Sequence, residues 1–222
     1  MRSFAELYDR AVARKGGVKA LEAVIPKPKS KAALERITDD RWLAEMTKSV
    51  FQAGFVWRVV ENKWADFERA FKGFDPHLVA YLSDENVERL VTDPTIIRHH
   101  KKILSTRENA TFILDLAAEY GSAAKFFATH PSNDYVGLLG VLKKRASRMG
   151  GSSAQYFLRR MGKDSFVLSR DVVKVLIAEA IVTKSPTARR DMAAVQQAFN
   201  SWGEESSRGL TTISRVLAMS TD

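Results

Sequence analysis

Apolar residues recur three or four positions apart along nearly the whole chain, and this spacing limits its fold more strongly than any other feature. It is the pattern of helices with one buried face, whereas half-buried strands alternate apolar and polar residues. Glycines and prolines divide the pattern into segments. Gly73 and Gly121, for example, directly follow such segments, which is typical of helix ends. The sequence therefore predicts an all-α protein.

The composition is that of a globular protein. The 222 residues are 45% hydrophobic and 27% charged. No apolar run approaches the roughly 20 residues of a membrane span, and residues 1–17 lack the apolar centre of a signal peptide. We therefore predict a cytoplasmic protein with no membrane partner.

Metal and cofactor chemistry finds little support in the sequence. The chain has no cysteine, which excludes disulfides and thiolate metal sites. The four histidines, His77, His99, His100 and His130, form no pair at helical metal spacing. We predict neither a metal nor a cofactor.

The charge balance points to a polyanionic partner. The formal net charge is +9, which favours DNA, RNA or an anionic membrane surface. A basic chain is also common among soluble proteins that have no such partner. Charge alone therefore leaves the partner open.

The segment SRMGGSSA, residues 147–154, indicates a tight turn between two helices, with basic residues on both sides. Glycines let the backbone approach a ligand, and a helix start presents free amides and a positive dipole end to a phosphate. The pattern fits a helix-hairpin-helix element that grips the DNA backbone. Its phosphate-binding residues are predicted to be Arg148, Gly150, Gly151, Ser152 and Ser153. An ordinary glycine turn with solvated basic faces explains the same residues.

A second set of motifs precedes this hairpin. It begins with QAGFVW at 52–57 and FDP at 74–76, and it ends with NA at 109–110. The matching residues are Gln52, Ala53, Gly54, Trp57, Phe74, Asp75, Pro76, Leu90, Asp93, Ile96, Ile97, Arg98, Lys102, Ile103, Asn109 and Ala110. In this order they resemble the DNA-3-methyladenine glycosylase I family, which belongs to the helix-hairpin-helix DNA glycosylase superfamily. The similarity covers about residues 40–130 well and the hairpin region loosely.

The resemblance implies two helical lobes around a cleft, in a monomer that binds double-stranded DNA. It also implies a monofunctional N-glycosylase of base excision repair that excises a flipped alkylated purine such as 3-methyladenine. Gly54 would end one helix so that Trp57 lines the base pocket, where an indole face suits a cationic base. Plain core packing is the alternative role for Trp57. The expected base-binding residues are Trp57, Ser49, Gln52 and Tyr156.

The chain departs from the family pattern at its chemistry. Ser49 stands where the family has its base-contacting glutamate, and Glu45 lies one helical turn earlier on the same face, where it either reaches into the pocket or lies at the surface. Ser169 stands at the superfamily's catalytic aspartate, with Asp171 two residues on. Glu45 and Asp171 are therefore the candidate catalytic carboxylates. Ser152 replaces the lysine of the lyase relatives, so the Schiff-base route lacks its amine. The family's zinc-binding cysteines are also missing.

The domain organisation follows from the same comparison. We expect an N-terminal helical arm and basic linker over 1–38, a glycosylase-like lobe over 39–130, and a hairpin lobe with the C-terminal helices over 131–222, packed as one compact unit. Two other functions stay open. One is a glycosylase-like DNA-binding protein that has lost catalysis, and the other is an all-helical adaptor whose basic face binds protein or anionic lipid. Salt-steep binding to duplex DNA separates the adaptor from both DNA functions.

Overall fold

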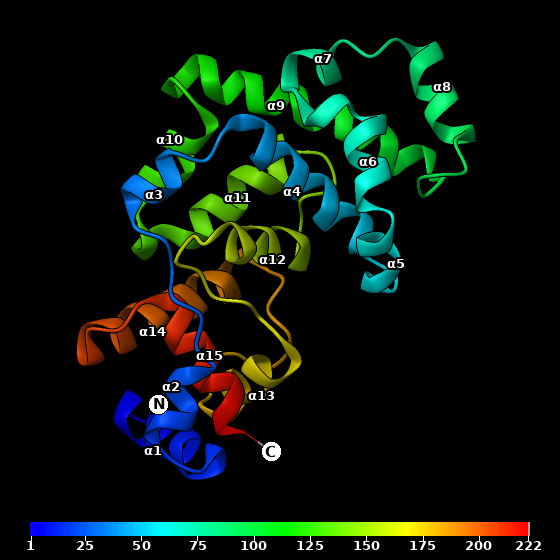
Figure 1. The fold of residues 1–222 in the computed structure, drawn as a ribbon. Coiled ribbons are helices and arrows are strands. Elements are labelled where there is room, and N and C mark those ends of the chain that lie inside the picture. Colours follow the sequence, from blue (N-terminus) through cyan, green and yellow to red (C-terminus); the bar gives the residue numbers. More distant parts are fainter. Residues whose placement is uncertain (222) are drawn as a thin grey trace. The chain divides into compact units, whose positions relative to one another are not determined.

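The computed structural model describes residues 1–221, and every element assigned among them is a helix (Figure 1). The α-helices are α1 Phe4–Lys15, α2 Val18–Ala23, α3 Lys31–Glu35, α4 Asp39–Gln52, α5 Trp57–Asn62, α6 Trp64–Ala70, α7 Pro76–Ala80, α8 Asp84–Thr92, α9 His100–Tyr120, α10 Ala123–Thr129, α11 Tyr135–Arg145, α12 Ser152–Met161, α13 Arg170–Ala178, α14 Arg189–Ser206 and α15 Leu210–Ser220. Short 3-10 helices cover Lys72–Phe74 (η1) and Ser132–Asp134 (η2). The all-α prediction is confirmed. No helix in the described part is both long and apolar enough to cross a membrane.

The chain forms two compact units. The central unit comprises residues 30–129 and 139–161, and the terminal unit comprises residues 1–29, 130–138 and the chain from Gly162 onward. The division between residues 129 and 130 lies next to the boundary expected after residue 130, whereas the other divisions follow residues 29, 138 and 161. The difference arises because α1 packs against α15, near the other end of the chain, while the hairpin before α12 packs with the central helices.

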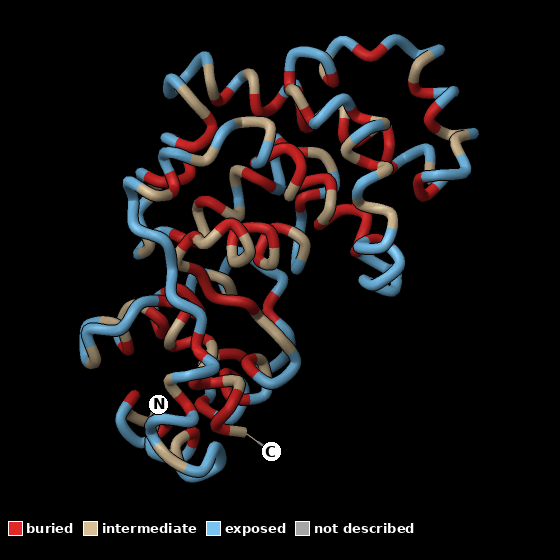
Figure 2. The backbone as a smooth tube through the Cα atoms, viewed as in Figure 1, coloured by how far each residue is buried: buried red, intermediate tan, exposed pale blue. Residues whose placement is uncertain are grey.

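Aromatic packing builds the core of the central unit. Trp42 on α4 is fully buried, stacks on Phe127 of α10 at 4.4 Å between ring centroids, and meets Phe157 of α12 edge-on at 5.7 Å. Figure 2 shows buried residues recurring along these helices. This one side chain therefore joins three helices, two of which carry the residues of the site described below.

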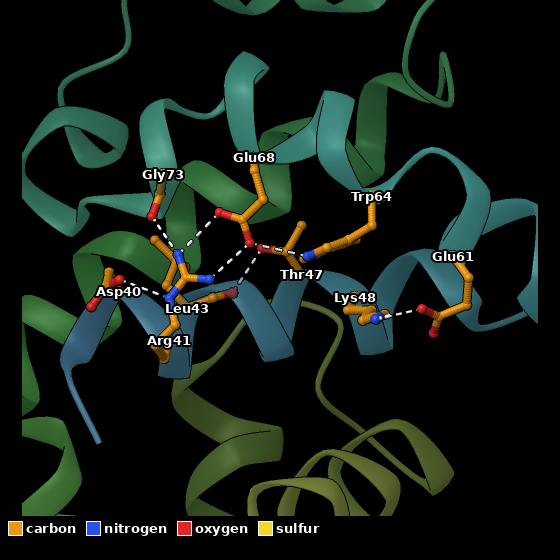
Figure 3. Close-up of polar contacts among 9 residues, drawn as sticks. All are labelled: Asp40, Arg41, Leu43, Thr47, Lys48, Glu61, Trp64, Glu68 and Gly73. Atoms are coloured by element: carbon orange, nitrogen blue, oxygen red, sulfur yellow. Dashed lines mark hydrogen bonds and ion pairs between the residues drawn. The ribbon is translucent and has the colours of Figure 1, made fainter. Parts of the chain in front are cut away.

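A second aromatic cluster fixes α6 on α4. Phe67 and Phe71 are fully buried, as their spacing predicts, whereas Trp64 is partly exposed and stacks on Phe67. The Trp64 indole N–H donates to Glu68 at 3.0 Å, and the same carboxylate accepts from Arg41 at 2.8 Å (Figure 3). The polar edge of the cluster is thus satisfied, and α6 is held in one register against α4.

The terminal unit joins the two ends of the chain. The backbone N–H of Arg2 donates to Glu179 at 2.7 Å, and the Trp202 indole N–H donates to the carbonyl oxygen of Arg2 at 3.1 Å. Asp164 accepts from the first backbone amides of α15, at 3.0 Å from Leu210 and 2.8 Å from Thr211. A carboxylate at this position favours the start of a helix. The N-terminal helix is therefore an integral part of this unit.

Candidate functional site

A pocket of about 180 Å³ lies within the central unit, where the end of α4, the start of α5 and the first turns of α12 meet. Its lining residues are Ser49, Gln52, Ala53, Gly54, Trp57, Ser152, Ser153, Tyr156 and Arg160. Trp57, Ser49, Gln52 and Tyr156, the residues expected to bind a base, all belong to this lining. The structure thus brings together side chains separated by about half the chain.

Gly54 explains how Trp57 reaches the pocket. Helix α4 ends at Gln52, and Gly54 adopts a positive φ of 77°, a conformation that glycine takes without the steric cost of a side chain. The chain then turns, and Trp57 begins α5 with 48% of its surface exposed. Its ring meets Tyr156 edge-on, with 5.5 Å between centroids and 84° between planes. Trp57 is therefore a wall of the pocket and not a core residue.

Polar contacts tie the start of α5 to α4. Lys48 pairs with Glu61 at 2.7 Å, and the Gln52 amide nitrogen donates to the same carboxylate at 3.0 Å (Figure 3 shows the Lys48–Glu61 pair). Glu61 lies on α5, the helix that Trp57 begins. These two contacts hold α5, which begins with Trp57, against the end of α4.

Arg160 supplies the charge of the pocket, and the sequence analysis did not identify it. Its Nη2 donates to the Ser49 hydroxyl at 2.6 Å, and its Nη1 donates to the side-chain oxygen of Gln52. The guanidinium carbon lies 5.3 Å from the centre of the Trp57 ring, within cation–π distance. The positive partner expected for this indole is thus already supplied by the protein. Only the basic composition of α12 signals such a residue in the sequence.

Glu45 lies behind Arg160 and does not line the pocket. Its Oε1 is 2.6 Å from Nε of Arg160, and the Ser49 hydroxyl approaches the same carboxylate at 3.5 Å. Burial raises the pKa of Glu45, while Arg160 and Lys48 oppose that rise. Glu45 therefore orients Arg160, and any effect of Glu45 on a bound ligand passes through that guanidinium.

Asp171, the other candidate carboxylate, belongs to the terminal unit. It lies in the first turn of α13 and lines a separate open hollow of about 560 Å³ with Arg14, Lys15, Ala218, Met219 and Thr221. Ser169, two residues earlier, is the N-cap of this helix and accepts from the backbone N–H of Val172 at 3.3 Å. Ser169, which the resemblance aligns with the superfamily's catalytic aspartate, thus caps α13.

The hairpin between α11 and α12 has the predicted turn. Gly151 adopts φ of +59° and Arg148 adopts the same left-handed value, so the turn contains a strained non-glycine residue. Asn109 on α9 clamps its start: its amide accepts from the backbone N–H of Ser147 at 2.7 Å and donates to the carbonyl oxygen of Ser147 at 3.1 Å. Arg148, Gly150, Gly151 and Ser152 are exposed. Ser152 and Ser153 open α12 and also line the pocket.

Lys102 anchors the other side of the α4 terminus. It is almost fully buried, and its Nζ donates to the carbonyl oxygens of Phe51 at 3.1 Å and Ala53 at 2.6 Å. Nζ also lies 4.4 Å from the centre of the Phe55 ring. A cation at the end of a helix satisfies carbonyls that have no partner inside the helix. Lys102 therefore holds the turn from which Trp57 projects.

The buried position of Lys102 predicts a pH dependence of stability. Burial, aided by Arg148, lowers the pKa of Lys102 from 10.5 to about 8. Between about pH 8 and pH 10.5 the folded protein loses this proton while the unfolded chain keeps it, so the free energy of unfolding rises with pH. We expect wild type to gain stability relative to Lys102→Met across this window, measured by urea unfolding at several pH values. A difference that stays constant from pH 7 to 10.5 would contradict the assignment.

An exposed apolar tip borders the pocket, and the sequence analysis did not identify this feature. Phe55, Val56 and Val59 are exposed by 40, 67 and 44%, next to Trp57 (the pale blue turn before α5 in Figure 2). A cluster of exposed apolar side chains often marks a site of contact with another molecule. The signal in the sequence was an apolar run directly after a helix-ending glycine.

The methyladenine glycosylase family model matches residues 34–139. Over 80 residues the chain is 41% identical to DNA-3-methyladenine glycosylase 1 of Escherichia coli (strain K12), a match that covers 36% of this chain and 43% of that relative. The matched part thus spans less than half the length of this curated relative.

Solved structures extend the similarity to most of the chain. A crystal structure of 3-methyladenine DNA glycosylase I matches with a TM-score of 0.50 and 25% identity, over 61% of this chain and 81% of that one. A Methanocaldococcus jannaschii 8-oxoguanine glycosylase/lyase, solved with DNA containing 8-oxoguanine, matches with a TM-score of 0.55 and 15% identity, over 96% of this chain and 95% of that one. At 15% identity this second match bears on the fold alone.

Proposed function

We propose that this chain, whose residues 34–139 match the methyladenine glycosylase family model, is a DNA N-glycosylase of base excision repair. It acts on double-stranded DNA and removes a flipped damaged purine, the alkylated purines such as 3-methyladenine being the class that the family implies. The observation that carries the proposal is the half-exposed Trp57 ring in a pocket beside the glycine hairpin.

The pocket supports base flipping. An enzyme that acts on a base within a duplex must extrude it into a pocket, where aromatic side chains stack on it. Trp57 and Tyr156 offer aromatic surfaces, while Ser49 and Gln52 offer polar atoms at the C-terminal end of α4. Phe55 and Val56, exposed beside the pocket, fit the apolar wedge that fills the gap left in the base stack.

The reaction class follows from the groups at hand. A lyase route needs an amine, and Ser152 occupies the position where the resemblance places that lysine. Hydrolysis with water as the nucleophile therefore leaves an abasic strand that is not cut. Glu45 positions Arg160 in this scheme, and Asp171, in the first turn of α13, stays the other candidate carboxylate from the sequence. Asp171→Asn, assayed for base release, tests the second assignment.

The hairpin is proposed to bind phosphates without reading sequence. Exposed Arg148 lies two residues before Gly150, and the amides that open α12 face the same turn. A glycosylase-like protein without catalysis is the second candidate, favoured by Ser49 at the glutamate position. The two candidates share DNA binding and differ in base release.

Arg148→Gln is expected to weaken DNA binding uniformly across sequences. One phosphate contact fewer lowers the slope of log affinity against log salt by about 1. The measurement is fluorescence anisotropy of a labelled duplex at four salt concentrations. Lys125→Gln, an exposed cation on α10, is the matched control and should leave the slope unchanged. Equal slopes for wild type and Arg148→Gln would remove the hairpin from the DNA interface.

A further inference from the structure

Arg160 gives the pocket a fixed positive charge. Among the lining residues it is the one that carries a formal charge, and none of them is a carboxylate. Its countercharge, Glu45, pairs with Nε from behind and lies outside the lining. A ligand in the pocket therefore meets the guanidinium directly and meets its countercharge only through it.

The neighbouring polar side chains accept hydrogen bonds from Arg160. The Ser49 hydroxyl and the Gln52 side-chain oxygen both accept from its terminal nitrogens. The Gln52 amide nitrogen is held by Glu61 at 3.0 Å, which fixes the amide orientation. One N–H donor on each terminal nitrogen of the guanidinium has such a partner, whereas Nε lies 2.6 Å from Glu45 in an ion pair that lacks hydrogen-bond geometry. One donor on each terminal nitrogen has no partner among the described residues and is available in the pocket.

This arrangement suits one class of base and opposes another. Two N–H donors of a guanidinium can pair with the O6 and N7 acceptors of a guanine-like purine, a pairing that arginine makes commonly. A cationic base would meet a like charge in a site without an accessible carboxylate, and the Trp57 ring is already in contact with the guanidinium. We propose that Arg160 makes the pocket selective for a neutral purine with acceptors at O6 and N7, as in hypoxanthine, over a cationic alkylated purine. The inference rests on the proposed glycosylase function and, among damaged purines, replaces the alkylated class that the family implies with a neutral one.

The positive charge of Arg160 also suits the bond-breaking step in which the purine leaves. When the bond between N9 and C1′ breaks, its electron pair stays on the purine, and a neutral purine leaves as an anion. Arg160 donates to the atoms on which this negative charge develops, which is the preorganised stabilisation that accelerates such steps. Water adds its oxygen to C1′, and its proton ends on the released purine. A cationic purine leaves neutral and gains nothing from Arg160.

Selection against intact guanine lies outside the pocket. A base must be unpaired before it enters, and a mismatched or damaged base costs less to flip than a paired one. Hypoxanthine pairs weakly with thymine, whereas guanine pairs strongly with cytosine. Arg160 therefore selects among bases that are already weakly paired.

The first test measures base release from two duplexes, one with hypoxanthine opposite thymine and one with 3-methyladenine. Each rate is divided by the spontaneous rate, because a cationic base is lost readily on its own. We expect the acceleration to be at least 10-fold larger for hypoxanthine, and Arg160→Gln to lower it about 100-fold for hypoxanthine and by a much smaller factor for 3-methyladenine. Arg160→Lys keeps the charge without the fork and should fall between the two, with folding checked by circular dichroism. A larger acceleration for 3-methyladenine, or equal losses on both substrates, would overturn the inference.

The second test separates this inference from the proposed function. Guanosine and 7-methylguanosine differ by one methyl group, which removes the N7 acceptor and adds a positive charge. If neither duplex loses a base, the glycosylase proposal fails. Binding of guanosine and 7-methylguanosine then tests the preference of the pocket on its own. We expect guanosine to bind at least 10-fold more tightly than 7-methylguanosine by calorimetry, and Arg160→Gln to abolish the preference. Equal affinities, the reverse order, or no saturable binding of either nucleoside would refute it.

Discussion

Trp57→Ala is expected to lower the release of free base by about 10- to 100-fold. Stacking of one base on an aromatic side chain is worth about 1–3 kcal/mol, and Trp57 provides such a face in the pocket. Because half of its surface is exposed, the loss of stability should be about 1 kcal/mol or less. Single-turnover release from a damaged duplex measures the first effect, and urea unfolding measures the second.

Trp57→Phe is the matched control for this prediction. It keeps an aromatic face at the same place, and release should stay within about threefold of wild type because the stacking surface is largely retained. If Trp57→Ala releases base as fast as wild type, the flipped base does not stack on this ring. The pocket would then lose its assigned role even if the protein were a glycosylase.

Trp42→Ala is expected to cost about 3–5 kcal/mol of stability, the range for truncating a large buried aromatic side chain. Trp42 is fully buried and lies against Phe127 and Phe157, so its removal leaves a cavity between α4, α10 and α12. The same substitution is thus expected to lower mainly base release at Trp57 and mainly stability at Trp42. Urea unfolding followed by circular dichroism measures the difference between them.

Trp42→Phe tests the reason for this cost. The Trp42 indole nitrogen has no hydrogen-bond partner among the described residues, so the side chain contributes through packing. Phenylalanine should therefore recover most of the stability lost in the alanine variant. Equal destabilisation by both substitutions would show that packing volume is not what Trp42 contributes.

Local sequence signals were sufficient for most of the fold. The positive φ of Gly54, Gly73 and Gly121 accords with helix ends at glycine, and Asp75 with Pro76 opens α7 as such a pair should. Proline is favoured at a first helical position, yet α14 begins at Arg189 and not at Pro186, because residues 183–188 form an irregular segment with bends. The short α3 after Ser30 was also not expected, since prolines dominate the linker before it.

The site was only partly predictable because its chemistry depends on contacts across the chain. Trp57, Ser49 and Gln52 lie within nine residues of one another, so one motif contained them. Arg160 meets Gln52 from 108 residues away, and no local pattern distinguishes it from its basic neighbours on α12. Glu45 was expected as a substitute for the missing glutamate on the basis of helical spacing. The structure places it against Arg160, which no spacing rule indicates.

Release of free purine by the purified protein is the most direct test of the central claim. The substrate is a labelled duplex carrying either hypoxanthine or 3-methyladenine, and products are separated with and without alkali. The account predicts release of the base by wild type, an abasic strand that breaks only after alkali, and loss of release with Trp57→Ala. No release from either duplex, with salt-sensitive DNA binding intact, would contradict it and leave a DNA-binding protein without glycosylase activity.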